Sequence, residues 1–285
     1  MTSANRPVTQ APSGDLTTFA ADQFTHVGKT WRVFRKGSGP AVVVMTEMPG
    51  ISPMVLGFAD RIVDLGCSVV LPDLFGTAGR DPLAGSKVVN IARAYATIAA
   101  TCVRRDFTAL ATGRSSPVVD WLRALAQHEH GRCGGPGVGA VGMCFTGGFA
   151  LAMAVDDRVL APVLSQPSLP FGVTKKHRAS IDISDRDLDT VARRCANDGL
   201  TVVGLRFKGD PFVPEERFAT LKQRLGPAFV AIELEQADGN PRGPLPKHHS
   251  VLTGDLIDEP GEPTRAALDT VLDLFRTRLL GAPRP

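Results

Sequence analysis

The residues best suited to chemistry in this chain are a cysteine inside a glycine-rich turn and a pair of histidines far downstream. Cys144 lies in the stretch Gly142-Met143-Cys144-Phe145-Thr146-Gly147, and His248 and His249 are adjacent. A cysteine thiolate is a strong nucleophile when a base removes its proton and a helix N-terminus favours its charge. These residue types therefore point to nucleophilic catalysis through a covalent bond to sulfur.

The sequence around Cys144 predicts a sharp turn from a strand, residues 137–142, into a helix, residues 145–154, with small residues at its start. Such a turn, called a nucleophile elbow, aims the nucleophile out of the sheet and leaves the amide N–H of Phe145 free to donate to an oxyanion. Thr146 stands where the usual motif, Gly-x-nucleophile-x-Gly, has its second glycine. A buried structural cysteine therefore remains an alternative on the local sequence alone.

A nucleophilic thiol also needs a base and a group that orients the base. Asp210 lies in a tight turn just after the predicted strand 201–207, and an ordinary turn aspartate is its alternative interpretation. Only His177, His248 and His249 follow the cysteine, and His177 lies in a basic segment that we expect to be exposed. The base is therefore one member of the pair, and position alone does not say which.

A further carboxylate, Glu47, follows the apolar strand predicted over residues 41–46, and a Pro-Gly loop comes after it. The loop after this strand normally supplies the second oxyanion N–H, here that of Met48. Glu47 would then lie beside the thiol, where it could form a hydrogen bond with it or take its proton. The alternative is an exposed glutamate that begins a loop.

Strand and helix patterns alternate along the chain, which is typical of a doubly wound α/β sheet. The predicted strands are 30–35, 41–46, 67–72, 137–142, 159–165, 201–207 and 229–235. The predicted helices are 54–65, 88–100, 117–129, 145–154, 185–197, 214–225 and 263–280. Several strands are apolar at successive positions, which fits central parallel strands covered on both faces. We expect a flexible N-terminal tail over residues 1–20 and a single domain over residues 21–285.

Composition narrows the function classes. Hydrophobic residues make up 43% of the chain and the net charge is +3, which is too small and scattered to predict nucleic-acid binding. No stretch reaches the length of a membrane span, and the first residues do not resemble a secretory signal. Five cysteines without CxxC spacing argue against a disulfide framework and a zinc site. The sequence therefore predicts a cytoplasmic protein with no cofactor and no metal.

Together the motifs resemble the dienelactone hydrolase family of α/β hydrolases. The matching segments are residues 47–50, 71–76, 142–145, 209–214 and 249–250, in the family's order, and the resemblance covers most of the chain. It implies an α/β-hydrolase fold, with a doubly wound, mostly parallel sheet flanked by helices. It also implies a triad of Cys144, His249 and Asp210, because the family's base is followed by serine.

The resemblance further implies that Glu47 holds the resting thiol and takes part in its activation, and that the amides of Met48 and Phe145 form the oxyanion hole. Well-known members of the family bind a substrate carboxylate with two arginines. The corresponding positions here are Thr77 and Thr253, so we expect a substrate other than dienelactone. An apolar cleft is expected instead, with pocket residues Phe75, Arg80, Met143, Gln166 and Phe212.

The resulting hypothesis is hydrolysis of a carboxylic ester or lactone through a cysteine acyl-enzyme. Two alternatives remain open: a non-catalytic or redox-responsive protein with a reactive thiol, and an acyltransferase. The expected partner is a small-molecule ester or lactone, and the expected assembly is a monomer or small homo-oligomer.

Overall fold

The computed structural model describes residues 13–81, 84, 106–241, 245 and 247–281. The helix predicted over residues 88–100 and the first twelve residues of the predicted tail lie outside these ranges. Residues 13–20 were also assigned to the tail, but there Leu16–Thr18 form a short 3-10 helix capped by Asp15. Phe19 is buried and the amide of Gly14 donates to the carbonyl of Pro53 at 2.8 Å, so this part packs on the domain.

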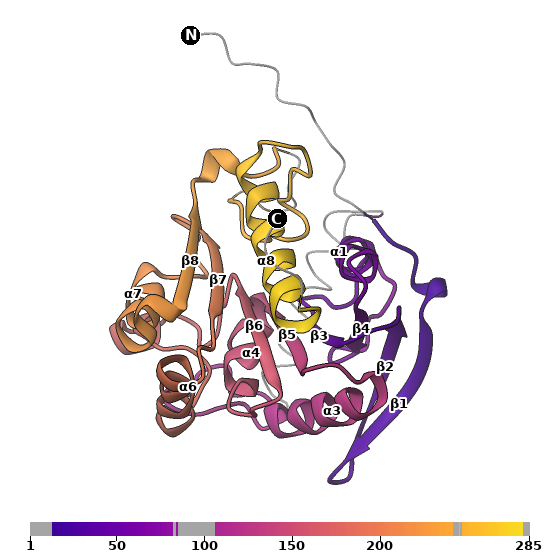
Figure 1. Cartoon of the computed structure of the whole chain (residues 1–285). Helices are drawn as coiled ribbons and strands as arrows, with labels where there is room; N and C mark the ends of the chain where they lie inside the picture. Colours follow the sequence, from indigo (N-terminus) through magenta and orange to yellow (C-terminus); the bar gives the residue numbers. More distant parts are fainter. Residues whose placement is uncertain (1–12, 82–83, 85–105, 242–244, 246, 282–285) are drawn as a thin grey trace.

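An eight-stranded sheet runs through the molecule in the order β1-β2-β4-β3-β5-β6-β7-β8 (Figure 1). The strands are β1 (Ala20–His26), β2 (Lys29–Lys36), β3 (Ala41–Met45), β4 (Ser68–Pro72), β5 (Val138–Met143), β6 (Val159–Ser165), β7 (Val202–Phe207) and β8 (Phe229–Leu234). Only the β1–β2 and β2–β4 pairings are antiparallel, and the remaining pairs are parallel. The predicted mostly parallel, doubly wound sheet is confirmed.

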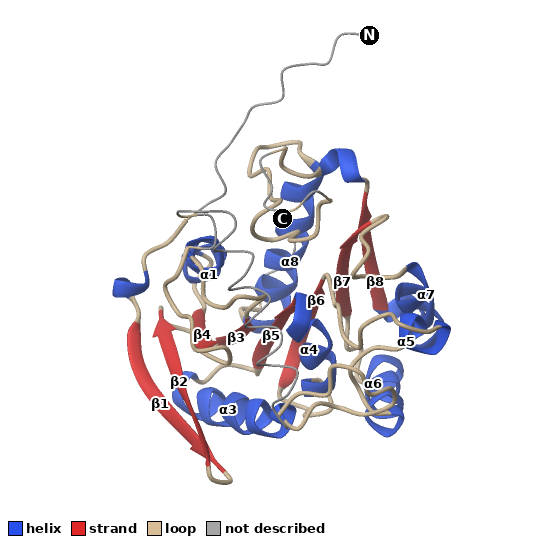
Figure 2. Ribbon diagram, turned by 180° about the vertical axis from the view of Figure 1, so that it is seen from behind, coloured by secondary structure: helices blue, strands red, loops and turns tan. Residues whose placement is uncertain are grey.

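Helices cover both faces of this sheet (Figures 1 and 2). One face carries α1 (Pro53–Asp64) and α8 (Pro263–Leu279), whose apolar side chains share one core cluster with the sheet. The other face carries α3 (Val118–Cys133), α4 (Gly147–Met153), α6 (Asp185–Asn197) and α7 (Glu215–Leu225), which share the second cluster. The short helix α5 (Lys175–Ala179) contacts α7.

The central strands are buried because they are apolar at successive positions. All five residues of β3 and all six of β5 are buried, which is possible only where helices cover both faces of the sheet. Strand β1 was missed in the sequence because it is a mostly exposed edge strand with little apolar alternation. Its seven residues pair with β2 from Ala20↔Arg35 to His26↔Lys29.

The parallel pairing brings the carboxyl ends of β3, β5, β6 and β7 to one edge of the sheet. In such folds the loops after neighbouring parallel strands converge and form the binding site. The segments that follow these four strands contain Glu47, Cys144, Gln166 and Asp210. The fold therefore brings segments that carry three predicted catalytic residues, Glu47, Cys144 and Asp210, to one edge of the sheet, together with the pocket candidate Gln166.

Candidate active site

Cys144 lies at the sharp turn between β5 and α4. Its φ is 53°, in the left-handed region that L-residues other than glycine rarely adopt. A 3-10 turn, Cys144–Thr146, connects the strand to the helix. A Cβ on Gly142 would lie 2.2 Å from the Thr146 carbonyl oxygen, and a Cβ on Gly147 would lie 2.4 Å from the Cα of Pro167. Glycine is therefore required on both sides of the turn, as a nucleophile elbow demands.

Thr146 has its own role in the position where the usual motif has glycine. Its hydroxyl accepts a hydrogen bond from the Met143 amide at 2.9 Å and donates to the carbonyl of Met45 at 2.8 Å. Met45 is the last residue of β3, and the side chain of Thr146 is fully buried. The threonine therefore ties the elbow to the strand that precedes Glu47 and Met48.

His249 and Asp210 form a buried pair in which His249 Nδ1 lies 2.6 Å from Asp210 Oδ2. Both residues are 4% exposed. The other oxygen of Asp210 accepts from the amide of Phe212 at 2.9 Å, which fixes the carboxylate in its turn. The ring of Phe212 packs edge-on against the imidazole, with centroids 5.4 Å apart. The acid is thus positioned to orient the histidine.

The pKa of His249 depends on Cys144 as well as on Asp210. Burial has the largest influence on His249 and by itself would lower its pKa. The negative charge on Cys144 and the interactions with Asp210 outweigh burial, so the pKa of His249 lies well above its usual value. Nε2 is buried and, among the described residues, has no partner with full hydrogen-bond geometry. Catalytic hydrogen bonds often tighten only when substrate binds.

His248 points elsewhere and is held by Asp255, a residue that the sequence analysis did not identify. His248 Nδ1 lies 2.7 Å from Asp255 Oδ1, while Asp255 Oδ2 accepts from the amides of His249 at 2.7 Å and Ser250 at 2.8 Å. The carboxylate of Asp255 is fully buried. It therefore fixes the loop that carries the catalytic histidine candidate. No sequence motif marks an aspartate six residues beyond that histidine.

Glu47 is buried at the centre of a network. Its carboxylate accepts from Ser250 Oγ at 2.7 Å, from Gln166 Nε2 at 3.1 Å and from the Thr253 hydroxyl. The sequence hypothesis brought Glu47 into direct contact with the thiol. In the part of the chain that the structure describes, its hydrogen bonds instead go to these three side chains, and the thiol accepts from Ser168 Oγ at 3.5 Å.

The two predicted oxyanion donors follow neighbouring strands. Met48 lies three residues beyond the end of β3, and Phe145 is in the first turn after β5. Amides in a first helical turn have no partner within the helix and so are free to bind an anion. Because β3 and β5 pair in parallel, with Met45 opposite Gly142, both segments start from the same edge of the sheet.

Five residues were predicted to line the substrate pocket, and the structure places them in different surroundings. Phe75 is half-buried and contacts the rings of Phe107 and Phe145 at centroid distances of 6.2 and 5.9 Å. Phe212 is 48% exposed and covers the imidazole. The remaining three are Arg80, which is exposed, and Met143 and Gln166, which are both fully buried.

The buried pair of pocket candidates does not present a side chain to an open surface. Met143 packs in the core on the α1 and α8 face because it ends a strand that is covered on both sides. Gln166 is held by its hydrogen bond to Glu47 and by its backbone, whose amide donates to the Leu205 carbonyl at 2.7 Å. Gln166 therefore acts on the site through Glu47.

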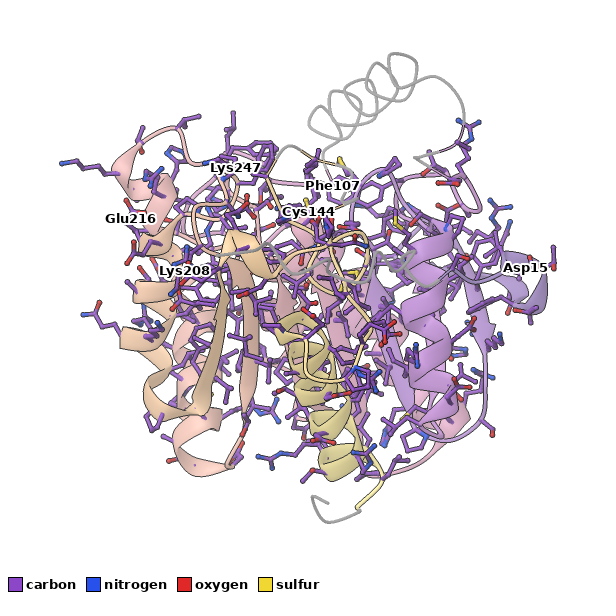
Figure 3. All side chains as sticks on the ribbon, turned by 90° about the horizontal axis from the view of Figure 1, so that it is seen from above. Asp15, Phe107, Cys144, Lys208, Glu216 and Lys247 are labelled. Carbon is purple, nitrogen blue, oxygen red and sulfur yellow. The ribbon has the colours of Figure 1, made fainter. Side chains whose placement is uncertain are left out.

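A surface cavity of about 500 Å³ lies on the outer side of the Asp210 turn. Its lining includes Lys208 and Lys247, which Figure 3 shows toward the β7–β8 side, whereas Cys144 and Phe107 lie near the centre of the same view. The described lining contains Asp210 but neither Cys144 nor His249. The cavity is therefore a neighbour of the candidate site and separate from the reacting sulfur.

No cluster of His, Cys, Asp and Glu suited to a metal ion occurs among the described residues. None of the described helices is long and apolar enough to cross a membrane.

Comparison with known families gives one match over most of the chain. The model of the dienelactone hydrolase family matches residues 29–240. This range contains Glu47, Cys144 and Asp210 and ends nine residues before His249. No curated protein matches the chain in sequence.

Solved structures share the fold at low sequence identity. A putative dienelactone hydrolase from Klebsiella pneumoniae is 14% identical, with a TM-score of 0.55, and the alignment covers 90% of this chain and 98% of that one. A dienelactone hydrolase-like promiscuous phosphotriesterase from metagenomic libraries is 18% identical, with a TM-score of 0.53 and coverage of 92% and 98%. A zinc-bound, cold-adapted esterase from an Arctic intertidal metagenomic library is 15% identical, with a TM-score of 0.52 and coverage of 95% and 98%.

Proposed function

Because the chain belongs to the dienelactone hydrolase family, we propose that it hydrolyses a carboxylic ester or lactone through a thioester on Cys144. The observation that carries the proposal is the buried His249–Asp210 pair, 2.6 Å apart, in which Cys144, at a strained strand-to-helix turn, helps to raise the pKa of His249. Strained backbone and a strongly shifted histidine pKa in one buried cluster are typical of functional sites.

In the first step the Cys144 thiolate attacks the carbonyl carbon, and the carbonyl electron pair moves onto oxygen. The amides of Met48 and Phe145 stabilise this oxyanion. When the tetrahedral intermediate collapses, the bond to the leaving oxygen breaks and His249 gives that oxygen the proton from Nε2. A thioester and a free alcohol result, or a tethered hydroxyl where the substrate is a lactone.

In the second step a water molecule attacks the thioester carbon while His249 accepts the water proton. The carbon–sulfur bond breaks, the acid product leaves, and the thiolate–imidazolium pair is restored. Asp210 stays ionised throughout, because its role is to orient the imidazole and stabilise its charge.

The surroundings of the site favour a substrate without a carboxylate near the scissile bond. The hydroxyl of Thr77 donates to the carbonyl of Pro49, and that of Thr253 donates to Glu47. Both threonines are thereby engaged within the protein, and the buried charge of Glu47 disfavours a second anion close by. We therefore propose a neutral ester or lactone with an apolar acyl group as the substrate class.

A thiolate nucleophile must stay reduced to work. The described cysteines, Cys67, Cys133, Cys144 and Cys195, are all free. The proposal accordingly assigns the protein to a reducing compartment such as the cytoplasm.

The test measures turnover of a panel of p-nitrophenyl esters and lactones, with and without a carboxylate, by wild-type protein and by Cys144→Ala and His249→Ala. We expect both variants to lose about three orders of magnitude or more in kcat. Cys133→Ala and His130→Ala, which change residues at the far end of α3, serve as matched controls with unchanged rates. Undiminished turnover in both site variants would overturn the proposal.

A pre-steady-state measurement separates hydrolysis from simple thiol binding. Wild-type protein should release a burst of p-nitrophenol equal to the concentration of sites, with an acyl group on the peptide that contains Cys144. A protein that only binds or senses through its thiol would show no stable thioester. Faster release of the acyl group with an added alcohol or amine acceptor would identify acyl transfer.

A further inference from the structure

The segment that follows β6 is locked onto the elbow from several directions. The amide of Ser168 donates to the Cys144 carbonyl at 2.9 Å. Pro167 lies so close to the elbow that Gly147 has no room for a Cβ. On the far side, the fully buried guanidinium of Arg217 donates to the carbonyls of Pro167 and Pro170, both at 2.6 Å. The side chain of Ser168 is therefore held in one place relative to the sulfur.

The hydroxyl of Ser168 has two acceptors within reach. Its Oγ lies 3.5 Å from Cys144 Sγ and 3.1 Å from the carbonyl oxygen of Gln166. Ser168 is 2% exposed, so bulk water does not compete for this proton. A hydroxyl has a single hydrogen to donate, and hydrogen bonds to ionised acceptors are roughly twice as strong as those to neutral ones. The proton therefore goes to sulfur when sulfur is a thiolate and to the carbonyl when sulfur is neutral.

We propose that Ser168 is a second side chain, besides His249, that acts on the nucleophile, by donating a hydrogen bond to the resting Cys144 thiolate and turning to the Gln166 carbonyl when the sulfur is acylated. The proton stays covalently bound to Ser168 Oγ throughout, and only the acceptor of its hydrogen bond changes. The second half of this cycle rests on the proposed function, whereas the first half requires only that Cys144 ionises.

Ser168 can take this role because the described hydrogen bonds of Glu47 go to other side chains and not to the sulfur. The carboxylate of Glu47 accepts hydrogen bonds from Gln166, Ser250 and Thr253, and a carboxylate has no proton to give to a thiolate. Ser168 is the side-chain hydroxyl that the described part of the structure places on the sulfur. The imidazolium of His249 and the hydroxyl of Ser168 then stabilise the thiolate together.

Stabilising the thiolate has two opposing consequences. A larger fraction of Cys144 is ionised at a given pH, but each thiolate is a weaker nucleophile, since reactivity falls as basicity falls with a slope of about 0.4–0.5. Loss of the hydroxyl should therefore slow Cys144 at low pH and leave it equal or faster at high pH. A purely structural role for Ser168 would lower the alkylation rate of the variant at every pH. At alkaline pH the proposed role instead predicts a rate that is unchanged or higher.

The experiment follows alkylation of Cys144 by iodoacetamide from pH 5 to pH 10 in the full chain, with quantification of the modified peptide by mass spectrometry. For Ser168→Ala we expect the pH midpoint to rise by about 0.5–1 unit. Below the midpoint the smaller thiolate fraction outweighs the gain in nucleophilicity, so the rate should fall about 2- to 4-fold, and the alkaline plateau should equal or exceed that of wild type by up to about 3-fold. Ser68→Ala, which removes a buried serine at the amino end of β4, should leave the profile unchanged.

Two further variants keep the proposal falsifiable. Ser168→Thr keeps the donor and should return the midpoint toward that of wild type. If Ser168→Ala does not fold, Ser168→Gly removes the same hydroxyl and is measured in the same way. An unchanged midpoint, or a uniform loss of rate across the pH range, would overturn the role of Ser168. Alkylation needs no ester, so this outcome is independent of whether Cys144→Ala abolishes ester turnover.

Discussion

Thr253 donates a hydrogen bond to the carboxylate of Glu47 across 206 positions of sequence. The contact joins the loop after β3 to the loop that carries His249, and Ser250 reinforces it with a second hydrogen bond at 2.7 Å. Glu47 thereby links the segment of one expected oxyanion donor, Met48, to the expected base. Such buried networks are strong when every member is satisfied and costly when one member is removed.

Replacing Glu47 by Gln should weaken this link without changing the size of the side chain. The amide oxygen still accepts from Thr253 or Ser250, but its NH₂ group faces donors and is left unsatisfied, at a cost of about 1–3 kcal/mol. We expect a lower Tm and a kcat reduced by about 10-fold or more, because the two loops lose their common anchor. Thermal unfolding and ester turnover measure both. Glu215→Gln, at an exposed position in the first turn of α7, is the control and should change neither.

Thr146 gives a second prediction, since its hydroxyl bridges Met143 and Met45. Thr146→Val keeps the shape of the side chain but leaves a buried amide and a buried carbonyl unpaired, so we expect a loss of about 1–3 kcal/mol in stability. The expected oxyanion amides should also separate, which lowers kcat more than it raises KM. Thr146→Ser retains the hydroxyl and should recover most of both quantities. Equal effects of the Val and Ser variants would contradict the bridging role.

Asp255 leads to a third prediction about the histidine loop. Its carboxylate receives the amides of His249 and Ser250 and one nitrogen of His248. In Asp255→Ala these buried donors lose their acceptor, so the imidazole of His249 is no longer held in position for its hydrogen bond with Asp210. We expect kcat to fall by about 100-fold with a small change in KM. His248→Gln should cost much less, because the two backbone hydrogen bonds to Asp255 remain; a larger loss in that variant would point to His248 as the base.

The sequence predicted the parts of the fold that depend on local pattern. Apolar runs such as residues 42–44 predicted central strands, and β3 is fully buried as expected. Strand β1 was missed because an exposed edge strand has no buried face to leave a periodic signal. The boundary of the N-terminal tail was also drawn too late, since Asp15 caps a turn and Phe19 reaches the core.

In the candidate site, too, some residues could be predicted from the sequence and others could not. Cys144, Asp210 and His249 could be proposed from turn chemistry, chain order and family resemblance. Ser168, Asp255 and the bridging function of Thr146 depend on contacts between distant segments, for which a single sequence carries no periodic signal. The partners of Glu47 show the limit clearly, because its position in the loop after β3 was predictable but the side chains that its carboxylate binds were not.

The raised pKa of His249 gives a prediction in solution. The folded protein favours the imidazolium, so the stability that this group contributes is complete below the unfolded pKa of about 6.5 and is lost as pH rises through the higher folded pKa. NMR titration of the imidazole should show a midpoint well above 6.5 in wild type. In Cys144→Ala the charge of the sulfur is gone while burial remains, so the midpoint should fall. Identical midpoints would show that Cys144 does not interact with the ring.

The last prediction concerns Asp182, a fully buried acid behind α4 that the proposed reaction does not use. Its carboxylate accepts from Ser116 Oγ at 2.6 Å and from Thr108 Oγ1 at 3.2 Å. Burial raises the pKa of Asp182 from 3.8 to about 7, although both hydrogen bonds and the charge of Arg217 oppose the change. The folded state therefore favours the protonated acid, and its contribution to stability is complete below pH 3.8 and lost as pH rises to about 7.

Asp182→Asn should remove this dependence, because the amide is neutral at every pH and its oxygen can still accept from Ser116. We expect the Tm of the variant relative to wild type to be higher at pH 8 than at pH 5, since only the wild type must ionise a buried group over that interval. Asp120→Asn, whose side chain is 80% exposed, should show the same Tm difference at both pH values. If Asp182→Asn also gave equal differences, the carboxyl would be ionised in the folded protein already at pH 5, with Arg217 as its compensating charge.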